Sequence, residues 1–149
     1  MNNGNDNDSC FDKGLAIRRQ VLGSEYVDAS LKGADEFTWP LQHLITEYCW
    51  GAVWSRPGLP LRDRSLINLA MITALNRPHE LKLHLHGALN NGISKEEIME
   101  VLLQAGIYCG APAALDSFRV AKEVFRERGI TLAPAGPAAA QAGVPVSQA

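Results

Sequence analysis

The chain has 149 residues, of which 14 are Lys or Arg and 16 are Asp or Glu, so its formal net charge is −2. The length fits one domain, and 46% hydrophobic with 20% charged residues is typical of a globular protein, which excludes a wholly disordered, collagen-like or coiled-coil chain. Balanced charge offers no basic surface to nucleic acid or to an anionic membrane, and no apolar run approaches the ~18 residues of a membrane span. We therefore expect neither nucleic acid nor membrane as a partner.

The two ends of the chain differ in composition from its middle. Residues 132–149 contain no charged residue, and Ala, Pro and Gly fill 12 of these 18 positions. Such a segment has little large apolar surface with which to offset its ordering entropy. The first ten residues are polar and acidic, unlike a secretory signal. We expect disordered tails at 1–10 and 132–149, and one folded domain at 11–131.

In the folded part, apolar residues recur with a period near 3.6, and no alternating run bounded by turn residues predicts a strand. The predicted helices cover residues 11–22, 25–32, 39–54, 62–75, 78–91, 95–108 and 112–128. Gly23 ends the first of them and leaves Ser24 free to cap the second. Ser94 and Glu97 have the spacing of a capping box, and Gly110 breaks the chain before the last helix. The prediction is an all-α domain of six or seven helices with antiparallel neighbours.

Two of these helices have unusual apolar patterns. The helix at 62–75 is apolar nearly all round, which favours a central place in the core. The helix at 39–54, with Pro40 in its first turn, has two stripes that both follow the helical period. We expect the stripe of Leu41, Leu44, Ile45, Tyr48 and Ala52 to face the core. The opposite stripe, His43, Glu47, Trp50 and Trp54, then faces a pocket, another subunit or a further part of its own domain.

Titratable residues are densest at 77–86. Glu80 and His84 are four residues apart and so lie one above the other on a helix that Pro78 opens. A carboxylate beside an imidazole favours the imidazolium form and orients the ring, as a general acid requires, although many such pairs are ordinary surface contacts. His86 lies about 200° round the helix from His84, so the two cannot share one metal ion on a straight helix. We assign no metal ligands.

Two further positions have chemical potential. Arg56 follows a Trp-bearing helix on a Pro-Gly loop, where a guanidinium could bind a carboxylate with two hydrogen bonds or cap the helix that precedes it. Tyr108 stands at the corner before Gly110, where its hydroxyl could point into a cleft. Arg62 and Arg64, at a helix start, are interpreted as structural charges.

Three cysteines, Cys10, Cys49 and Cys109, form no C-x-x-C pair, so neither a disulfide framework nor a zinc site is indicated. An odd count favours a reducing cytoplasm. We expect Cys49 and Cys109 to be buried, inert thiols.

Several blocks in this order resemble the 4-carboxymuconolactone decarboxylase family, over about residues 12 to 128. They are Arg19-Gln20-Val21-Leu22-Gly23, the tryptophan-rich block 45–59, Glu80-x-x-x-His84, Asn91-Gly92, the segment 96–104, and Tyr108-x-Gly110-x-Pro112-Ala113-Ala114. The resemblance implies a compact alkylhydroperoxidase D-like helical domain that assembles as a homo-oligomer, a trimer or hexamer, with the Trp stripe at a subunit boundary. It also implies cofactor-free decarboxylation of 4-carboxymuconolactone to 3-oxoadipate enol-lactone in protocatechuate degradation.

On this resemblance, the expected ligand is a dicarboxylate lactone that serves as its own electron sink, with no cofactor. His84, oriented by Glu80, would donate to the oxyanion or protonate the ring, and Arg56 would anchor a carboxylate. The expected pocket wall is Trp50 and Trp54, and the remaining substrate-binding candidates are His86 and Tyr108.

Departures from the family pattern leave alternatives open. The peroxidase branch of the superfamily has a C-x-x-C dithiol four residues before its His, and here those positions hold Arg77 and Glu80. The decarboxylases more often have Arg at the position of His86 and Ala at those of Cys49 and Cys109. The alternatives are a decarboxylase or lyase for a related lactone or oxo-acid, a thiol peroxidase using Cys49 and Cys109, and a non-catalytic helical oligomer.

Overall fold

The computed structural model describes residues 9–136, and this part of the chain is helical with no strand. This confirms the all-α prediction. The elements are α1 (Cys10–Leu22), α2 (Ser24–Lys32), α3 (Trp39–Leu44), the π-helix η1 (Ile45–Trp54), α4 (Leu61–Ala74), α5 (Pro78–Asn90), α6 (Lys95–Cys109) and α7 (Ala111–Glu127). None of these helices has the length and apolarity needed to cross a membrane.

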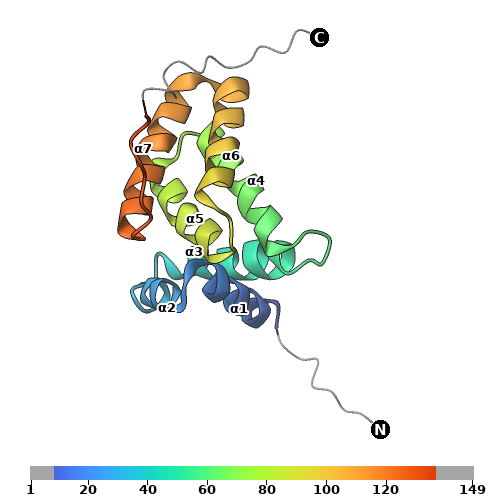
Figure 1. Ribbon diagram of the computed structural model, residues 1–149. Helices are drawn as coiled ribbons and strands as arrows, with labels where there is room; N and C mark the ends of the chain where they lie inside the picture. The colour runs from blue at the N-terminus through green and yellow to red at the C-terminus, as the bar shows by residue number, and fades with distance from the viewer. Residues whose placement is uncertain (1–8, 137–149) are drawn as a thin grey trace.

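Helices α4 to α7 form a bundle, and α1, α2 and the continuous α3–η1 segment lie across one end of it (Figure 1). The bundle encloses a core of apolar residues from α4 to α7 with Ile93 between them. That core comprises Leu69, Leu81, Leu85, Ala88, Ile93, Ile98, Leu102, Ala121, Val124 and Phe125. A second cluster, between the end layer and α5, contains Val21, Leu22, Val27, Trp50 and Trp54. The two clusters meet along α5, which packs against α1 as well as α4 and α7.

Local signals set most helix ends. The Ser94 hydroxyl accepts from the Glu97 amide at 3.1 Å, and the Glu97 carboxylate accepts from the Ser94 amide at 2.9 Å, which confirms the capping box. Gly110, at φ +111°, separates α6 from α7 as predicted. The predicted cap at Ser24 is wrong, because Ser24 already belongs to α2 and Gly23 precedes it as the cap residue.

The structure moves the boundary of the N-terminal tail. The hydroxyl of Ser9 accepts from the Asp12 amide at 3.1 Å, so α1 begins at Cys10 and not at Phe11. The rest of the predicted N-terminal tail, 1–8, lies outside the described residues. Of the predicted C-terminal tail, 132–136 have no regular secondary structure, and 137–149 also lie outside the described residues.

Glycines bring α1 into direct backbone contact with η1. A Cβ at Gly14 would overlap the Thr46 carbonyl oxygen and lie 2.6 Å from the Gly51 nitrogen. A Cβ at Gly51 would overlap the carbonyl oxygen of Cys10. Glycine at both positions allows the two backbones to approach closely, and this contact fixes the position of η1 along the axis of α1.

The predicted core stripe of the helix at 39–54 is wrong, whereas Trp50 and Trp54 of the other stripe pack inside their own domain, one of the three places expected for that stripe. Trp50 and Trp54 are 3% and 5% exposed inside the domain, whereas Leu41, Leu44 and Tyr48 are 56%, 52% and 62% exposed. Two features of the structure turn Trp50 and Trp54 inward. First, η1 is a π-helix, whose i→i+5 hydrogen bonds turn successive side chains by less than 100° per residue. Second, α1 packs against the face of η1 that contains Gly51.

Helix α4 is less central in the core than predicted, because its buried residues are only Ser65, Leu69 and Thr73. Its outer face shows Ile67 at 44%, Met71 at 49% and Leu75, just past its end, at 68% exposure. The helix is apolar all round because one apolar face lines the bundle and another remains uncovered in the single chain.

Candidate functional site

The candidate site lies where the end layer meets the bundle, at His84 of α5. The imidazole of His84 is half-buried and stacks parallel to Trp50, with ring centroids 6.4 Å apart and an interplanar angle of 6°. Trp54, one turn further along η1, packs on Trp50 with centroids 4.6 Å apart. The structure therefore brings together three predicted site residues from two elements that are about 30 positions apart in sequence.

Asn68 of α4 sets the state of the His84 ring. Its side-chain nitrogen lies 3.4 Å from Nδ1 of His84. An amide nitrogen donates and does not accept, so Nδ1 is the acceptor and the neutral ring has its proton on Nε2. The Nε2–H group thus remains available to a ligand.

Burial and Glu80 have opposite effects on the pKa of His84. Burial lowers the pKa of His84 below the ordinary histidine range, and the negative charge of Glu80 offsets only part of this effect. Glu80 is exposed and makes no hydrogen bond to His84 in the described part of the chain. Desolvation of the ring therefore outweighs the carboxylate in its effect on the His84 pKa, and the role of Glu80 in orienting His84 stays a prediction.

The loop after η1 places Arg56 near Trp54 in sequence but at the surface. Its side chain is exposed, and within residues 9–136 its guanidinium caps no helical carbonyl. The Arg56 amide donates to Val53 O at 3.2 Å, so the backbone makes the turn that the side chain was expected to cap. Arg56 stays a prediction as a carboxylate ligand.

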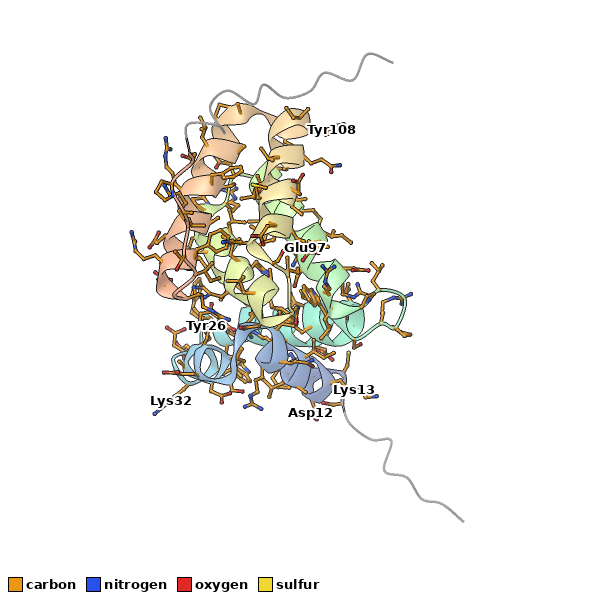
Figure 2. The ribbon with its side chains drawn as sticks, viewed as in Figure 1. Asp12, Lys13, Tyr26, Lys32, Glu97 and Tyr108 are labelled. Carbon is orange, nitrogen blue, oxygen red and sulfur yellow. The ribbon has the colours of Figure 1, made fainter. Side chains whose placement is uncertain are left out.

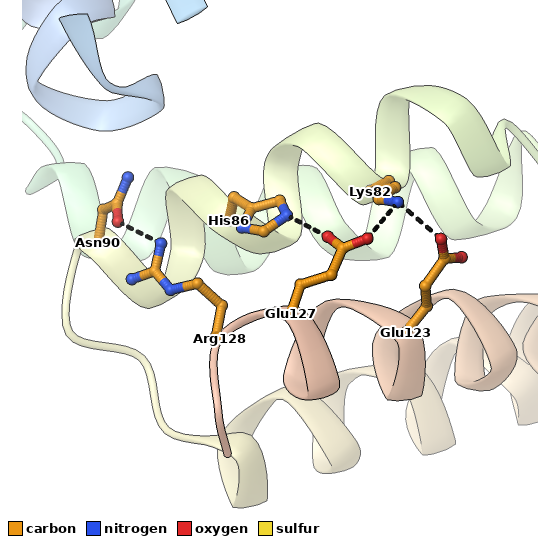
Figure 3. Close-up of polar contacts among 6 residues, drawn as sticks. All are labelled: Lys82, His86, Asn90, Glu123, Glu127 and Arg128. Atoms are coloured by element: carbon orange, nitrogen blue, oxygen red, sulfur yellow. Dashed lines mark hydrogen bonds and ion pairs between the residues drawn. The ribbon is translucent and has the colours of Figure 1, made fainter. Parts of the chain in front are cut away.

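His86 does not belong to this site. Its Nε2 lies 3.1 Å from an oxygen of Glu127, on the face of α5 that packs against α7 (Figure 3). Lys82 on the same face donates to Glu127 and to Glu123, each at 2.7 Å, and a neighbouring contact joins Arg128 to Asn90. The turn of α5 directs His86 to this network and away from His84, and its role as a substrate ligand stays a prediction.

Tyr108 and the cysteines are also not with His84. Tyr108 is 83% exposed at the far end of α6, well away from α1 and the end layer (Figure 2). It borders a surface cavity of about 360 Å³ between α4 and α6. Cys49 and Cys109 are exposed, so their predicted burial is wrong, and Figure 1 shows their elements, η1 and the end of α6, at opposite ends of the molecule. Within residues 9–136 no three His, Cys, Asp or Glu side chains are placed to hold a metal ion.

Sequence reasoning missed Asn68. It is the only amide side chain in the otherwise largely apolar middle of α4, and a lone amide in such a setting usually has a buried partner. That signal predicts a hydrogen bond for Asn68 without indicating that the partner is His84, which lies on another helix.

Comparison with known proteins identifies the family of this helical chain. The Carboxymuconolactone decarboxylase family matches residues 40–123, which contain all of η1, α4, α5 and α6. The chain belongs to the carboxymuconolactone decarboxylase family.

Individual relatives extend the match. The chain is 42% identical over 120 residues to the 4-carboxymuconolactone decarboxylase of Acinetobacter baylyi, which covers 80% of this chain and 90% of that protein. It is 45% identical over 117 residues to the nitrosuccinic acid decarboxylase npaB of Metarhizium robertsii, covering 78% and 82%. An uncharacterized 15.0 kDa protein of Paracoccus denitrificans is 32% identical over 86 residues.

Proposed function

We propose that the protein is a carboxy-lyase that decarboxylates 4-carboxymuconolactone to 3-oxoadipate enol-lactone, a step of aromatic degradation. The relative from Acinetobacter baylyi supports the substrate. The observation that carries the chemistry is the His84 ring, which stacks on Trp50 and whose Nδ1 lies 3.4 Å from the Asn68 side-chain nitrogen; burial lowers its pKa and so favours the neutral form. A positioned neutral donor suits a reaction that creates negative charge on an oxygen.

In this reaction the bond between the ring and its carboxylate breaks, and CO2 leaves. The electron pair moves through the ring double bond to the lactone carbonyl and forms a dienolate. His84 Nε2–H donates to that oxygen, and the dienolate then takes one proton from solvent at carbon. We propose that Glu80, exposed one turn before His84 on α5, relays this proton from solvent.

The Trp pair gives the reaction an apolar wall. Trp50 and Trp54 are almost completely buried, so a carboxylate beside them is poorly hydrated while neutral CO2 is not penalised. Arg56, on the exposed loop that follows, is proposed to attract the dianionic substrate.

A second substrate, nitrosuccinic acid, is favoured by the 45% identity to its decarboxylase. Loss of the carboxylate next to the nitro group gives a nitronate, in which the charge again lies on oxygen. The same His84 donor would stabilise both anions, so the site chemistry accommodates either acid.

Measuring CO2 release and ultraviolet loss of substrate with both acids tests the proposal. We expect turnover of the lactone by metal-stripped protein at a kcat/KM above that for nitrosuccinate. Turnover of nitrosuccinate alone would transfer the function to the second candidate. Turnover of neither acid would contradict both and favour a binding protein.

Replacing Asn68 tests the tautomer assignment. In Asn68→Asp the new carboxylate accepts from Nδ1–H, which raises the pKa of His84. The proton of the neutral ring then moves from Nε2 to Nδ1, so kcat should fall ~10²-fold or more. Because burial lowers the wild-type pKa of His84, kcat/KM should decline below the pH at which an ordinary histidine titrates, and in Asn68→Asp this decline should begin at higher pH. Nitrogen chemical shifts of the imidazole report the tautomer directly.

Asn68→Leu removes the hydrogen bond without adding charge and serves as the matched comparison. It should lower kcat without raising the pKa of His84. A wild-type ring with its proton on Nδ1, or an Asn68→Asp variant with unchanged kcat, would contradict the assignment.

We also propose that the protein forms a homo-oligomer, a trimer or hexamer. Large apolar side chains on α4 and α6 that the single chain leaves exposed support this proposal. They include Ile67, Met71, Leu75, Leu103 and Ile107. The cytoplasmic location expected from the cysteines stays a prediction.

A further inference from the structure

Arg64, near the start of α4, is a half-buried cation with unused donors. Its Nε is shielded from solvent and has no hydrogen-bond partner among residues 9–136. One Nη2 hydrogen is donated to the Arg56 carbonyl at 3.1 Å. No carboxylate in the described part of the chain pairs with Arg64, whereas Arg62, two residues earlier, pairs with Glu97 and Asp63.

The position of Arg64 connects it to the candidate site. It lies four residues before Asn68, so the two side chains share one face of α4, and Asn68 contacts His84. Arg64 also donates to the carbonyl of Arg56, which lies two residues beyond the buried Trp54. The guanidinium is therefore held against the loop at 55–60, and Arg64 shares its helix face with the residue that contacts His84.

A guanidinium that is shielded from solvent, contacts only neutral groups and has an unpaired N–H destabilises the folded protein unless an anion binds to it. The fork of Arg64 retains enough free N–H groups to bind a carboxylate with two hydrogen bonds. We propose that Arg64 binds the carboxylate that the substrate retains, the one on its carboxymethyl arm. The inference rests on the proposed decarboxylase function and adds a specificity residue to it.

The retained carboxylate is the better partner for physical reasons. A cation on the leaving carboxylate would stabilise the ground state and oppose loss of CO2, whereas a cation on the arm binds substrate and transition state equally. Both candidate substrates, the lactone and nitrosuccinate, have the same –CH2–COO⁻ arm. Arg64 would therefore recognise the feature that the two acids share, and the exposed Arg56 would act earlier, by attraction.

Arg64→Met and Arg64→Lys test the proposal. Methionine preserves most of the buried stem, and lysine preserves the charge but removes the fork. Loss of a charge-assisted contact should raise KM for the lactone ~10- to 100-fold in Arg64→Met, with kcat changed much less. The KM of Arg64→Lys should lie between those of the wild type and Arg64→Met.

Arg62→Met is the matched control. It removes an arginine from the same turn of α4 but breaks the ion pairs to Glu97 and Asp63, so KM should stay at the wild-type value. Should Arg64→Met fail to fold, Arg64→Lys measured against Arg62→Met decides the question. If both variants fold, an unchanged KM in Arg64→Met and Arg64→Lys overturns the inference. If only Arg64→Lys folds, an unchanged KM in that variant overturns it. Either result leaves the proposed decarboxylase function in place.

A binding measurement separates the two proposals. Succinate, which has the same arm, is titrated against tryptophan fluorescence, with the response dominated by Trp50 and Trp54. If the wild type decarboxylates neither acid, the proposed function fails, and succinate binding that disappears in Arg64→Met still supports Arg64 as a carboxylate site. No succinate response in the wild type under those conditions overturns the inference as well.

Discussion

Replacing His84 with alanine is expected to lower kcat ~10²- to 10⁴-fold, the usual contribution of a positioned proton donor. The variant loses the imidazole that stacks on Trp50 and contacts Asn68. The fold should tolerate the change because the ring is only half-buried. Steady-state kinetics with the lactone, beside a circular dichroism melt, measures both effects.

His84→Gln makes the test more specific. The glutamine nitrogen can occupy the place of Nε2 and donate to the oxyanion, but it cannot take up a second proton. If His84 acts as a neutral donor, His84→Gln should retain more activity than His84→Ala. His79→Ala, an exposed histidine on the same helix, is the control and should leave kcat unchanged. Near-wild-type turnover by folded His84→Ala would remove His84 from the mechanism.

Alanine at Gly14 is expected to lower the free energy of unfolding by about 3 kcal/mol, at the upper end of the cost of overpacking. The added methyl would overlap the Thr46 carbonyl and crowd the Gly51 nitrogen, and backbone atoms in two helices cannot move aside as a flexible side chain can. Helix η1 must shift, so kcat should fall as well, because Trp50 directly precedes Gly51. Urea unfolding and tryptophan fluorescence report the two effects.

Gly58→Ala provides the comparison for that result. A Cβ at Gly58 meets no atom within 4 Å, so stability should stay within about 0.5 kcal/mol of wild type. Equal stability of Gly14→Ala and Gly58→Ala would show that α1 and η1 do not depend on backbone contact. Gly51→Ala should be as destabilising as Gly14→Ala, since its methyl would overlap the Cys10 carbonyl.

Sequence alone predicted what short-range physics decides. The capping box at Ser94 and the break at Gly110 depend on residues within one turn, so the helix ends could be placed closely. The motif at Glu80 and His84 was found for the same reason, because spacing along one helix determines which side chains share a face. His84 and the Trp pair were correctly expected to meet, on the basis of the family resemblance.

Tertiary structure alone decided the environment of those residues. The inward direction of Trp50 followed from the π-helical turn and from the glycine contact with α1, neither of which the 3.6 period reports. Whether His84 is charged depends on how much water its neighbours exclude, and here burial prevails over Glu80. Asn68 contacts His84 from another helix, and the proposed role of Arg64 depends in the same way on packing between helices. A hydrogen bond or a shielded charge between helices depends on packing, which no spacing along a single segment can specify.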